Sequence, residues 1–252
     1  MSQKVLVTAG ANGIGREIVR AFVEAGAQVA VCDIDVPALA ALQAQWPGIT
    51  TYECDVGRRA DVEGMVSSAV QALGGLDVLV NNAGIGGPTS SVEQFSPEEW
   101  DRVVAVNLTG TFDVTRLSIP HLKQSAAGSI IVMSSAAGRF GYPYRSAYSA
   151  TKWALVGFAK TLAIELGDWG IRANALLPGA VDGERLHRVY AGRVEATGQS
   201  LETVLEAAMA GQSLKRFVDP RDIAAMAVFL ASDAGKSISG QALCIDNDMQ
   251  KA

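Results

Sequence analysis

The sequence predicts an α/β fold, in which a doubly wound parallel sheet of seven strands carries helices on both faces. Short apolar runs alternate with longer stretches of helical period along the chain, which is the pattern of repeated βαβ units. No internal repeat or low-complexity linker interrupts this rhythm, so we expect a single domain spanning residues 1–252. Apolar residues make up 49% of the chain and charged residues 19%, which is enough for a large core without a disulfide or a metal.

The apolar runs and the helical periods between them place the elements. Strands are expected near 4–8, 28–33, 50–54, 77–81, 129–134, 171–177 and 241–245. Helices are expected near 13–25, 36–45, 58–73, 97–124, 147–167 and 220–232. Residues 180–215 are about twice as long as a simple crossover needs, which predicts one or two surface helices. We interpret them as a lid over a substrate pocket; a structural insertion or a subunit contact is the alternative.

Charge and targeting signals exclude several classes of protein. The net charge is −5 and Lys and Arg are not clustered, so neither a nucleic acid nor a membrane surface is an expected partner. The first residues, MSQKVLVTAG, do not form a signal peptide, and the roughly 18-residue apolar run of a membrane span is nowhere present. We therefore expect a cytoplasmic protein.

Cysteine and histidine usage argues against disulfides and metals. Cys32, Cys54 and Cys244 include no CxxC pair, and each lies in or at the end of an expected strand, so we predict reduced thiols. His121 and His187 are too few and too isolated for a zinc site. No metal is expected, and any acid/base chemistry must come from other side chains.

A glycine-rich turn follows the first expected strand. The strand KVLVT leads into AGANGIGREIVRAF, between a strand and an amphipathic helix. Glycine permits unusual dihedral angles, lets the backbone approach a pyrophosphate and directs the helix N-terminus at its charge. Such a turn alone also fits an ordinary strand-to-helix connection. The candidate dinucleotide-binding residues in it are Gly10, Asn12, Gly13, Ile14 and Gly15.

The second expected strand, QVAVCDID, ends at an acidic residue. Asp33 follows the glycine turn at the interval expected of a dinucleotide site, where a carboxylate can accept both hydroxyls of an adenosine ribose. A 2′-phosphate would meet a like charge there, and neither Ala11 nor Asn12 offers a compensating cation. The expected cofactor is therefore NAD, with NADP disfavoured. Asp35 is better explained as a helix N-cap or a solvated acid.

Two further strand ends carry polar or small residues. The third strand ends in CDV and the fourth in NNAG, each at the carboxyl edge where open α/β sheets bind ligands. Asp55 can meet an adenine amino group, whereas Asn81 better fits a structural role that ties neighbouring strands together. The candidate cofactor residues at these ends are Asp55, Val56, Asn82, Ala83 and Gly84.

An acid/base pair is predicted in the stretch SAYSATKWALVGF. Tyr148 and Lys152 lie four residues apart on an expected helix, so both side chains share one face. A free tyrosine titrates at about pH 10, and a fixed positive charge nearby lowers the pKa of the phenol towards neutral pH. The pair alone is a weak signal, because such spacings also arise by chance.

Two more polar residues support this pair. Ser135 follows the strand SIIVM at a carboxyl edge, where its hydroxyl can bond a substrate oxygen or simply begin a turn. Asn107 lies in the apolar helical stretch RVVAVNLTGTFDVT, where an amide must find a partner. It could anchor a water beside the lysine.

Together these residues resemble the short-chain dehydrogenase/reductase family, in its compact one-domain branch, over nearly the whole chain. TAGANGIG is similar to the cofactor turn of the family and NNAG to its fourth-strand signature. The resemblance implies a Rossmann-type fold and hydride transfer between a nicotinamide and the CH–OH group of a secondary alcohol, or the reverse. The residues at the positions of the catalytic tetrad are Asn107, Ser135, Tyr148 and Lys152.

The resemblance also implies a role for each of these residues. Tyr148 is the acid/base, and Ser135 holds the substrate oxygen. Lys152 binds the nicotinamide ribose and tunes Tyr148, while Asn107 supports the proton relay. Further cofactor contacts are implied at Pro178, Gly179 and Val181 besides Tyr148 and Lys152. The family further implies a homotetramer built through helix pairs, with a dimer as the alternative.

Three positions depart from the family pattern. Ala9 replaces the usual first glycine of the turn, and Gly183 replaces a threonine that would meet the nicotinamide carboxamide. The second change puts that contact in doubt. IDND stands where IDGG is typical, so residues 246–248 are expected to alter a subunit contact or a pocket edge.

We expect a substrate pocket between residues 85–95, residues 138–147 and the lid. Cationic side chains are present in these segments, namely Arg145, Arg185, His187, Arg188 and Arg193. They favour a small polar substrate such as a hydroxy acid or a sugar derivative, unless the lid charges are simply solvated. Two other functions stay open: an NADPH-dependent 3-oxoacyl carrier-protein reductase, and a catalytically silent cofactor sensor or scaffold.

Overall fold

A computed structural model describes residues 2–250, apart from the side chains of residues 184 and 185. Within these residues, seven strands form one sheet in the order β3-β2-β1-β4-β5-β6-β7, and all neighbouring strands are parallel. The strands are β1 (Lys4–Thr8), β2 (Gln28–Asp33), β3 (Thr50–Glu53), β4 (Val78–Asn81), β5 (Ser129–Met133), β6 (Arg172–Pro178) and β7 (Ala242–Ile245). The strand order reverses between β1 and β4, which confirms the predicted doubly wound sheet.

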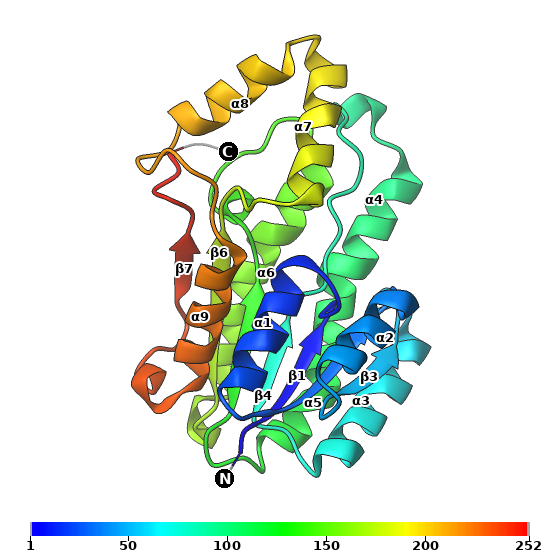
Figure 1. The fold of residues 1–252 in the computed structure, drawn as a ribbon, viewed down its shortest axis with the longest axis vertical. Coiled ribbons are helices and arrows are strands. Elements are labelled where there is room, and N and C mark those ends of the chain that lie inside the picture. The colour runs from blue at the N-terminus through cyan, green and yellow to red at the C-terminus, as the bar shows by residue number, and fades with distance from the viewer. Residues whose placement is uncertain (1, 251–252) are drawn as a thin grey trace.

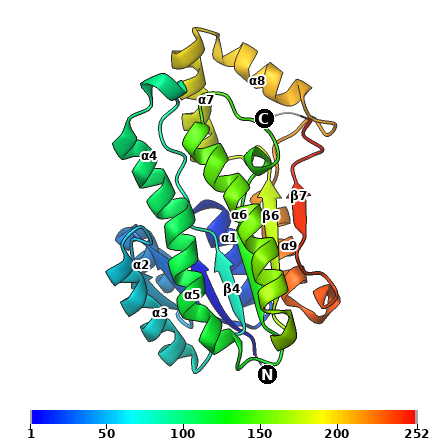
Figure 2. The same ribbon diagram turned by 180° about the vertical axis from the view of Figure 1, so that it is seen from behind.

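Helices cover both faces of the sheet, as Figures 1 and 2 show from opposite sides. One face carries α1 (Gly13–Glu24), α2 (Val36–Gln45) and α9 (Pro220–Ala231), and the other carries α3 (Arg59–Leu73), α5 (Gly110–Leu122) and α6 (Ser146–Glu165). Successive side chains along a strand point to opposite faces of the sheet, so they pack alternately in the hydrophobic cores on its two sides. In β1, Val5 and Val7 pack with α1 and α9, whereas Leu6 packs on the opposite side.

The helix expected over residues 97–124 is the element that departs most from prediction. It is divided into α4 (Pro97–Val104), a π-helical turn (Ala105–Thr109) and α5. The N–H of Gly110 donates to the carbonyl of Ala105, one residue further back than in an α-helix. Gly110 also packs on the backbone of Val56, where a Cβ would lie 2.5 Å from the carbonyl oxygen. The helix therefore approaches the β3–α3 loop as closely as a glycine allows.

Two helices, α7 (Glu184–Thr197) and α8 (Leu201–Ala210), occupy the segment predicted as a lid. They project beyond the carboxyl ends of the strands (Figure 1). No helix within residues 2–250 combines the length and the apolar character needed to cross a bilayer.

Candidate active site

The glycine turn lies between β1 and α1, at the carboxyl edge of the sheet, and has no room for larger side chains at two positions. A Cβ on Gly10 would lie 2.5 Å from Cγ1 of Val31, and one on Gly15 would overlap the carbonyl oxygen of Ala9. Gly13 has a φ of +52° and open space beside it. The first turn of α1 has neither an acidic residue nor a side-chain cap, so its N–H groups suit an anion such as a pyrophosphate.

Ala9 adopts a φ of +50° in this turn. The left-handed region costs a residue with a Cβ about 1–2 kcal/mol, which explains why glycine is usual here. The departure from the family pattern therefore leaves a strained residue in the turn.

Asp33 ends β2 beside the turn. One carboxylate oxygen accepts the N–H of Ala11 at 3.0 Å, and the other accepts the N–H of Asp35 at 3.1 Å. Asp35 caps α2 by accepting the N–H of Ala38, which confirms its predicted N-cap role. Asn12 bonds to Asp35 at 3.0 Å instead of capping α1. Two backbone bonds thus hold the Asp33 carboxylate next to the turn.

Asp55 forms an ion pair that the sequence does not predict. Its carboxylate lies 2.8 Å from Nη2 of Arg102 in α4 and also accepts the N–H of Gly57 at 2.9 Å. Nothing in the local sequence marks Arg102, which is 47 residues away and lies in a helix with several charges. The carboxylate expected to meet an adenine therefore already has a cationic neighbour.

Asn82 holds the glycine turn in place through its amide. Its Nδ2 donates to the carbonyls of Thr8 and Ala9, at 3.1 and 2.9 Å. Oγ1 of Thr8 in turn accepts the N–H groups of Asn82 and Ala83, each at 3.0 Å. These bonds give Asn82 a structural role at the cofactor edge, and Thr8, the first residue of the TAGANGIG motif, shares it.

Asn107 and Lys152 lie beside Gly84, directly after β4, and Tyr148 lies next to Lys152. A Cβ on Gly84 would lie 3.3 Å from both Oδ1 of Asn107 and Nζ of Lys152. Nζ of Lys152 lies 5.6 Å from the ring centroid of Tyr148. The small residue predicted at this strand end therefore lies beside two of the four tetrad side chains, and a third, Tyr148, adjoins Lys152.

Ser135, the fourth tetrad residue, follows β5 and begins the short 3₁₀ turn Ala136–Gly138. It is half-buried, and its Oγ accepts the N–H of Ala137 at 3.1 Å, so it does begin a turn. Two bonds tie this region to α6: Oγ of Ser134 donates to the carbonyl of Lys152 at 2.7 Å, and Oγ of Ser149 donates to that of Ala137 at 2.9 Å.

The two buried polar members of the tetrad bond mainly to backbone groups. Lys152 is buried, and its Nζ donates to the carbonyl of Met133 at 2.7 Å. Asn107 is buried and accepts the N–H of Ile85 at 2.8 Å. Its Nδ2 donates to the carbonyl of Ile85 at 3.0 Å and to Oγ1 of Thr151 at 3.1 Å. Both amide hydrogens are used within the protein, so a water beside the lysine would have to bind another atom of Asn107.

The loop around residue 89, the segment before Tyr148 and the helix α7 meet beside the tetrad. Arg145 is buried, with its guanidinium carbon 5.4 Å from the ring centroid of Tyr148 and 6.0 Å from that of Tyr142. Arg193 of α7 lies 5.4 Å from the same Tyr142 ring. Nη1 of Arg145 also lies 3.5 Å from Oγ1 of Thr89. Two arginines thus flank one tyrosine next to Tyr148.

The other lid cations differ from these two. His187 and Arg188 are exposed, and His187 lies 3.7 Å from an exposed carboxylate, that of Asp182. The Arg185 side chain lies outside the described residues. Burial raises the pKa of Tyr190, a lid tyrosine, to about 12, so Tyr190 is poorly suited to proton transfer near neutral pH.

The C-terminal segment holds the residues that follow α8. Asn247 and Asp248 have φ values of +57° and +55°, at the positions where the family pattern has glycines. Nδ2 of Asn247 donates to the carbonyl of Arg216 at 2.6 Å, and Ser213 bonds to Asp248. Asp246 pairs with Arg139 at 3.2 Å. The IDND sequence therefore holds the segment after α8 close to the residues that follow Ser135.

Asp246 also packs against the end of β6. A Cβ on Gly179 would lie 2.8 Å from Cα of Asp246, so only glycine fits after Pro178. Val181 forms a bridge to Val218 below the lid, and Gly183 caps α7 with a φ of +144°. A threonine at residue 183 would adopt this backbone conformation only with strain.

The cysteines and the surface grooves lie apart from the tetrad. All three cysteines are free, and Cys32 and Cys54 are buried; a hydrogen bond with Cys54 and burial raise the pKa of the Cys32 thiol. Within the described part of the chain, no three His, Cys, Asp or Glu side chains are grouped to hold a metal.

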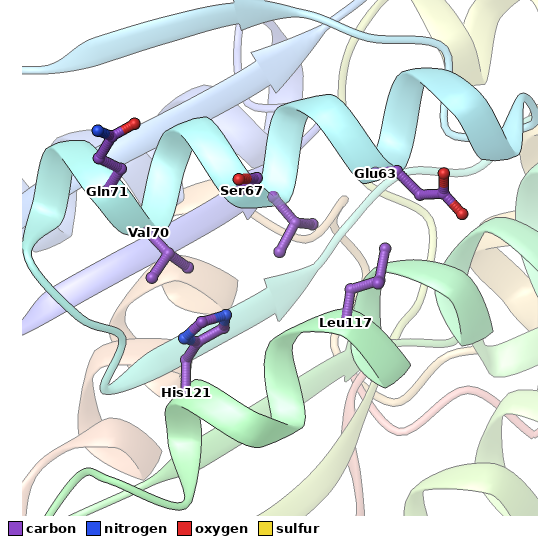
Figure 3. Close-up of a pocket in the computed structure, with 7 residues that line it drawn as sticks. Glu63, Ser67, Val70, Gln71, Leu117 and His121 are labelled. Carbon is purple, nitrogen blue, oxygen red and sulfur yellow. The ribbon is translucent and has the colours of Figure 1, made fainter.

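A groove of about 290 Å³ lies between α3 and α5, where Val70, Leu117 and His121 face one another (Figure 3). It is on a helical face, away from the tetrad.

The chain is similar to known oxidoreductases over most of its length. Residues 8–249 match the family model described as enoyl-(acyl carrier protein) reductase. The chain is 39% identical to L-fucose dehydrogenase of Bos taurus, over 91% of this chain and 83% of that protein. It is 37% identical to D-beta-hydroxybutyrate dehydrogenase of Cupriavidus necator, over 93% of each.

A solved structure of a ketoreductase is also similar to this chain. A single-residue variant of actinorhodin polyketide ketoreductase with NADPH superposes with a TM-score of 0.93 at 30% identity, covering 100% of this chain and 98% of that one. The chain therefore belongs to the short-chain dehydrogenase/reductase family of NAD(P)-dependent oxidoreductases.

Proposed function

We propose that this protein is an NAD-dependent dehydrogenase that interconverts a small, polar secondary alcohol and the corresponding ketone. The observation that carries the proposal is that Asn107 and Lys152 lie beside Gly84, with Tyr148 next to Lys152. Gly84 follows β4, which is hydrogen-bonded to the strand that leads into the glycine turn. The acid/base pair on α6 thus reaches a strand end next to the one that carries the dinucleotide turn, which is the arrangement that hydride transfer needs.

The residues of the chain fit four parts of the cofactor. The glycine turn and the N-terminus of α1 would hold the pyrophosphate, and Asp33 would hold the adenosine ribose. Asp55 and Val56 would border the adenine. Residues 82–84, together with Pro178, Gly179 and Val181, would border the nicotinamide. When bound, the nicotinamide supplies the site that accepts or donates the hydride.

The protein's own groups would handle the proton. In the oxidative direction Tyr148 takes the hydroxyl proton of the alcohol, and it returns the proton to the ketone in the reverse direction. Lys152 is buried and close to Tyr148, so its ammonium stabilises negative charge on the phenol oxygen and would also hold the ribose. Ser135 would hold the substrate oxygen through its hydroxyl.

The preference for NAD rests on the charge at the end of β2. Two backbone N–H groups fix the Asp33 carboxylate beside the turn, and it would repel a 2′-phosphate. NADP stays the alternative, because a similar ketoreductase structure contains NADPH. A 3-oxoacyl carrier-protein reductase stays open on the same ground, and tighter binding of NADPH than of NADH would favour it.

The polar substrate is supported by two arginines. Arg145 and Arg193 flank Tyr142 beside Tyr148, where they could receive a carboxylate or sugar hydroxyls. Two similar proteins are named for a hydroxy acid and for a sugar as substrates. The alternative is that the cations are simply solvated. This explanation fits His187 and Arg188, which are exposed, better than it fits Arg145 and Arg193.

A substrate panel tests this proposal. NAD is supplied with hydroxy acids, sugars, polyols and neutral apolar alcohols, and the reduced nicotinamide is measured. We expect turnover of an acid or a sugar, and we expect Arg145→Gln to raise its KM at least tenfold while the exposed control His187→Gln does not. Good turnover of apolar alcohols alone would contradict the polar substrate.

We further infer a homo-oligomer, a tetramer as the family implies or else a dimer. Phe112 of α5 and Trp153 and Ile164 of α6 are exposed apolar side chains, and these helices cover the same face of the sheet (Figure 2). Analytical ultracentrifugation tests this inference, and Ile164→Glu is expected to shift the protein towards smaller species. The cytoplasmic location stays a prediction from the sequence.

A further inference from the structure

A ladder of buried polar side chains runs from β4 into the helix that carries Asn107. Nδ2 of Asn81 donates to Oγ1 of Thr115 at 2.9 Å. Oγ1 of Thr115 donates to the carbonyl of Thr111 at 2.7 Å, and Oγ1 of Thr111 donates to the carbonyl of Asn107 at 2.8 Å. All four residues are buried. Asn81 therefore ties its strand to a helix, rather than to a neighbouring strand as predicted.

The ladder ends where the helix leaves α-helical geometry. In the π-helical turn, Gly110 bonds to Ala105, five residues back. Such a turn contains one extra residue and shifts the following carbonyls out of the regular pattern. A threonine hydroxyl that bonds to the carbonyl four residues back bends a helix locally. Thr111 and Thr115 make two such bonds in succession, immediately after the turn.

The same turn sets the place of Asn107 relative to the proposed catalytic pair. Nδ2 of Asn107 donates to Oγ1 of Thr151, and Oγ1 of Thr151 donates to the carbonyl of Tyr148 at 2.9 Å. On its other side, Oδ1 of Asn107 faces the same point beside Gly84 as Nζ of Lys152. A shift of Asn107 would therefore reach both Tyr148 and Lys152.

We propose that Thr111 and Thr115 are positioning residues for this site, whose hydroxyls hold the π-helical turn in the geometry that keeps Asn107 against Ile85 and Thr151. Both threonines are buried beneath the turn and act through Asn107. The inference rests on the proposed function, since it takes Asn107, Tyr148 and Lys152 as the site of proton transfer.

The test removes one hydroxyl without a large change of shape. Thr111→Val deletes the donor to the Asn107 carbonyl, and Thr111→Ser restores it. Thr109→Val is the matched control, because Thr109 lies in the same turn but is exposed. For each variant, kcat, KM and the pH profile are measured with NAD and D-beta-hydroxybutyrate, or with L-fucose if only the sugar reacts. Hydrogen–deuterium exchange of residues 84–110 is measured on the same samples.

We expect Thr111→Val to lower kcat about tenfold, to leave the KM for NAD within about twofold, and to shift the rising limb of the pH profile to higher pH. Exchange around Ile85 and residues 105–110 is expected to accelerate. Thr111→Ser should recover most of each effect, and Thr109→Val should match the wild type. A general loss of folding would instead raise exchange throughout the chain and would not be rescued selectively by serine.

The positioning role of the threonines and the proposed function are overturned by different outcomes. Wild-type kcat, pH profile and exchange rates in Thr111→Val would overturn the positioning role. Turnover by Tyr148→Phe equal to that of the wild type would overturn the proposed function, whatever the exchange shows. If neither D-beta-hydroxybutyrate nor L-fucose reacts, exchange decides: unchanged rates in Thr111→Val refute the ladder, and selective acceleration supports it.

Discussion

Asp33→Asn is the substitution that bears most directly on the choice of cofactor. The Asp33 carboxylate is fixed by the N–H groups of Ala11 and Asp35, at 3.0 and 3.1 Å. For a carboxylate about 5 Å from a phosphate charge, an effective dielectric constant of about 40 gives roughly 1.7 kcal/mol of repulsion. Two phosphate charges give about 3 kcal/mol, or roughly a hundredfold preference against a 2′-phosphate. Salt screening reduces this value, because the residue is only half-buried.

The assay measures dissociation constants for NADH and NADPH by nicotinamide fluorescence. We expect the wild type to favour NADH by about ten- to a hundredfold, and Asp33→Asn to lose most of that ratio. Asp35→Asn is the control, because it neutralises a neighbouring exposed acid and keeps a good N-cap residue. A thermal melt checks the fold, since the amide gives up one of two acceptors and costs about 1 kcal/mol. An unchanged ratio in Asp33→Asn, or tighter NADPH binding by the wild type, would refute the reasoning.

Three further predictions concern the stability of the fold and of the segment after α8. Ala9→Gly should leave Tm unchanged or raise it. The change relieves about 1–2 kcal/mol of strain from the left-handed backbone conformation and costs about 0.5–1 kcal/mol, because glycine loses more conformational entropy on folding. A clear fall in Tm would contradict this prediction. Hydrogen bonding to Arg221 lowers the pKa of Asp219 to about 2. The carboxylate therefore stabilises the fold fully above its usual pKa of about 4, and this stabilisation is lost as the pH falls through about 2. Asp219→Asn should therefore have a lower Tm than the wild type at pH 7, and this gap should shrink as the pH falls from 4 towards 2; an equal gap at pH 7 and at pH 2 would refute the reasoning. Arg139→Met should accelerate hydrogen exchange at residues 211–216 and 246–250, unlike the exposed control Arg188→Met, and equal exchange would show that the pair with Asp246 does not hold the segment after α8.

The regular elements were predictable because short-range patterns determine them. The strand SIIVM and the helix around Tyr148 were placed within about two residues of their observed bounds. The π-helical turn was not predicted, because it depends on long-range packing. Gly110 must meet the backbone of Val56, and the ladder must reach back to Asn81. Neither contact leaves a periodic signal in the helix sequence.

The candidate site was predictable only as far as strand ends and helix faces define it. Chain order alone indicated that Asp33, Asp55 and Asn82 would gather at one edge of the sheet. Which atoms remain available there depends on distant partners, such as Arg102 beside Asp55. Similarly, the sequence contains five candidate cations near the pocket and does not distinguish buried Arg145 from exposed His187 and Arg188.

The most direct measurement of the proposed chemistry is NAD reduction by the wild type and by Tyr148→Phe, followed through the absorbance of the reduced nicotinamide. With D-beta-hydroxybutyrate or L-fucose, the wild type should reduce NAD. The Tyr148→Phe variant should be slower by about 10²- to 10⁴-fold, because the acid/base is lost, while it binds NADH as the wild type does. Equal rates in the two proteins would contradict a proton transfer by Tyr148, and with it the catalytic role proposed for Asn107, Tyr148 and Lys152.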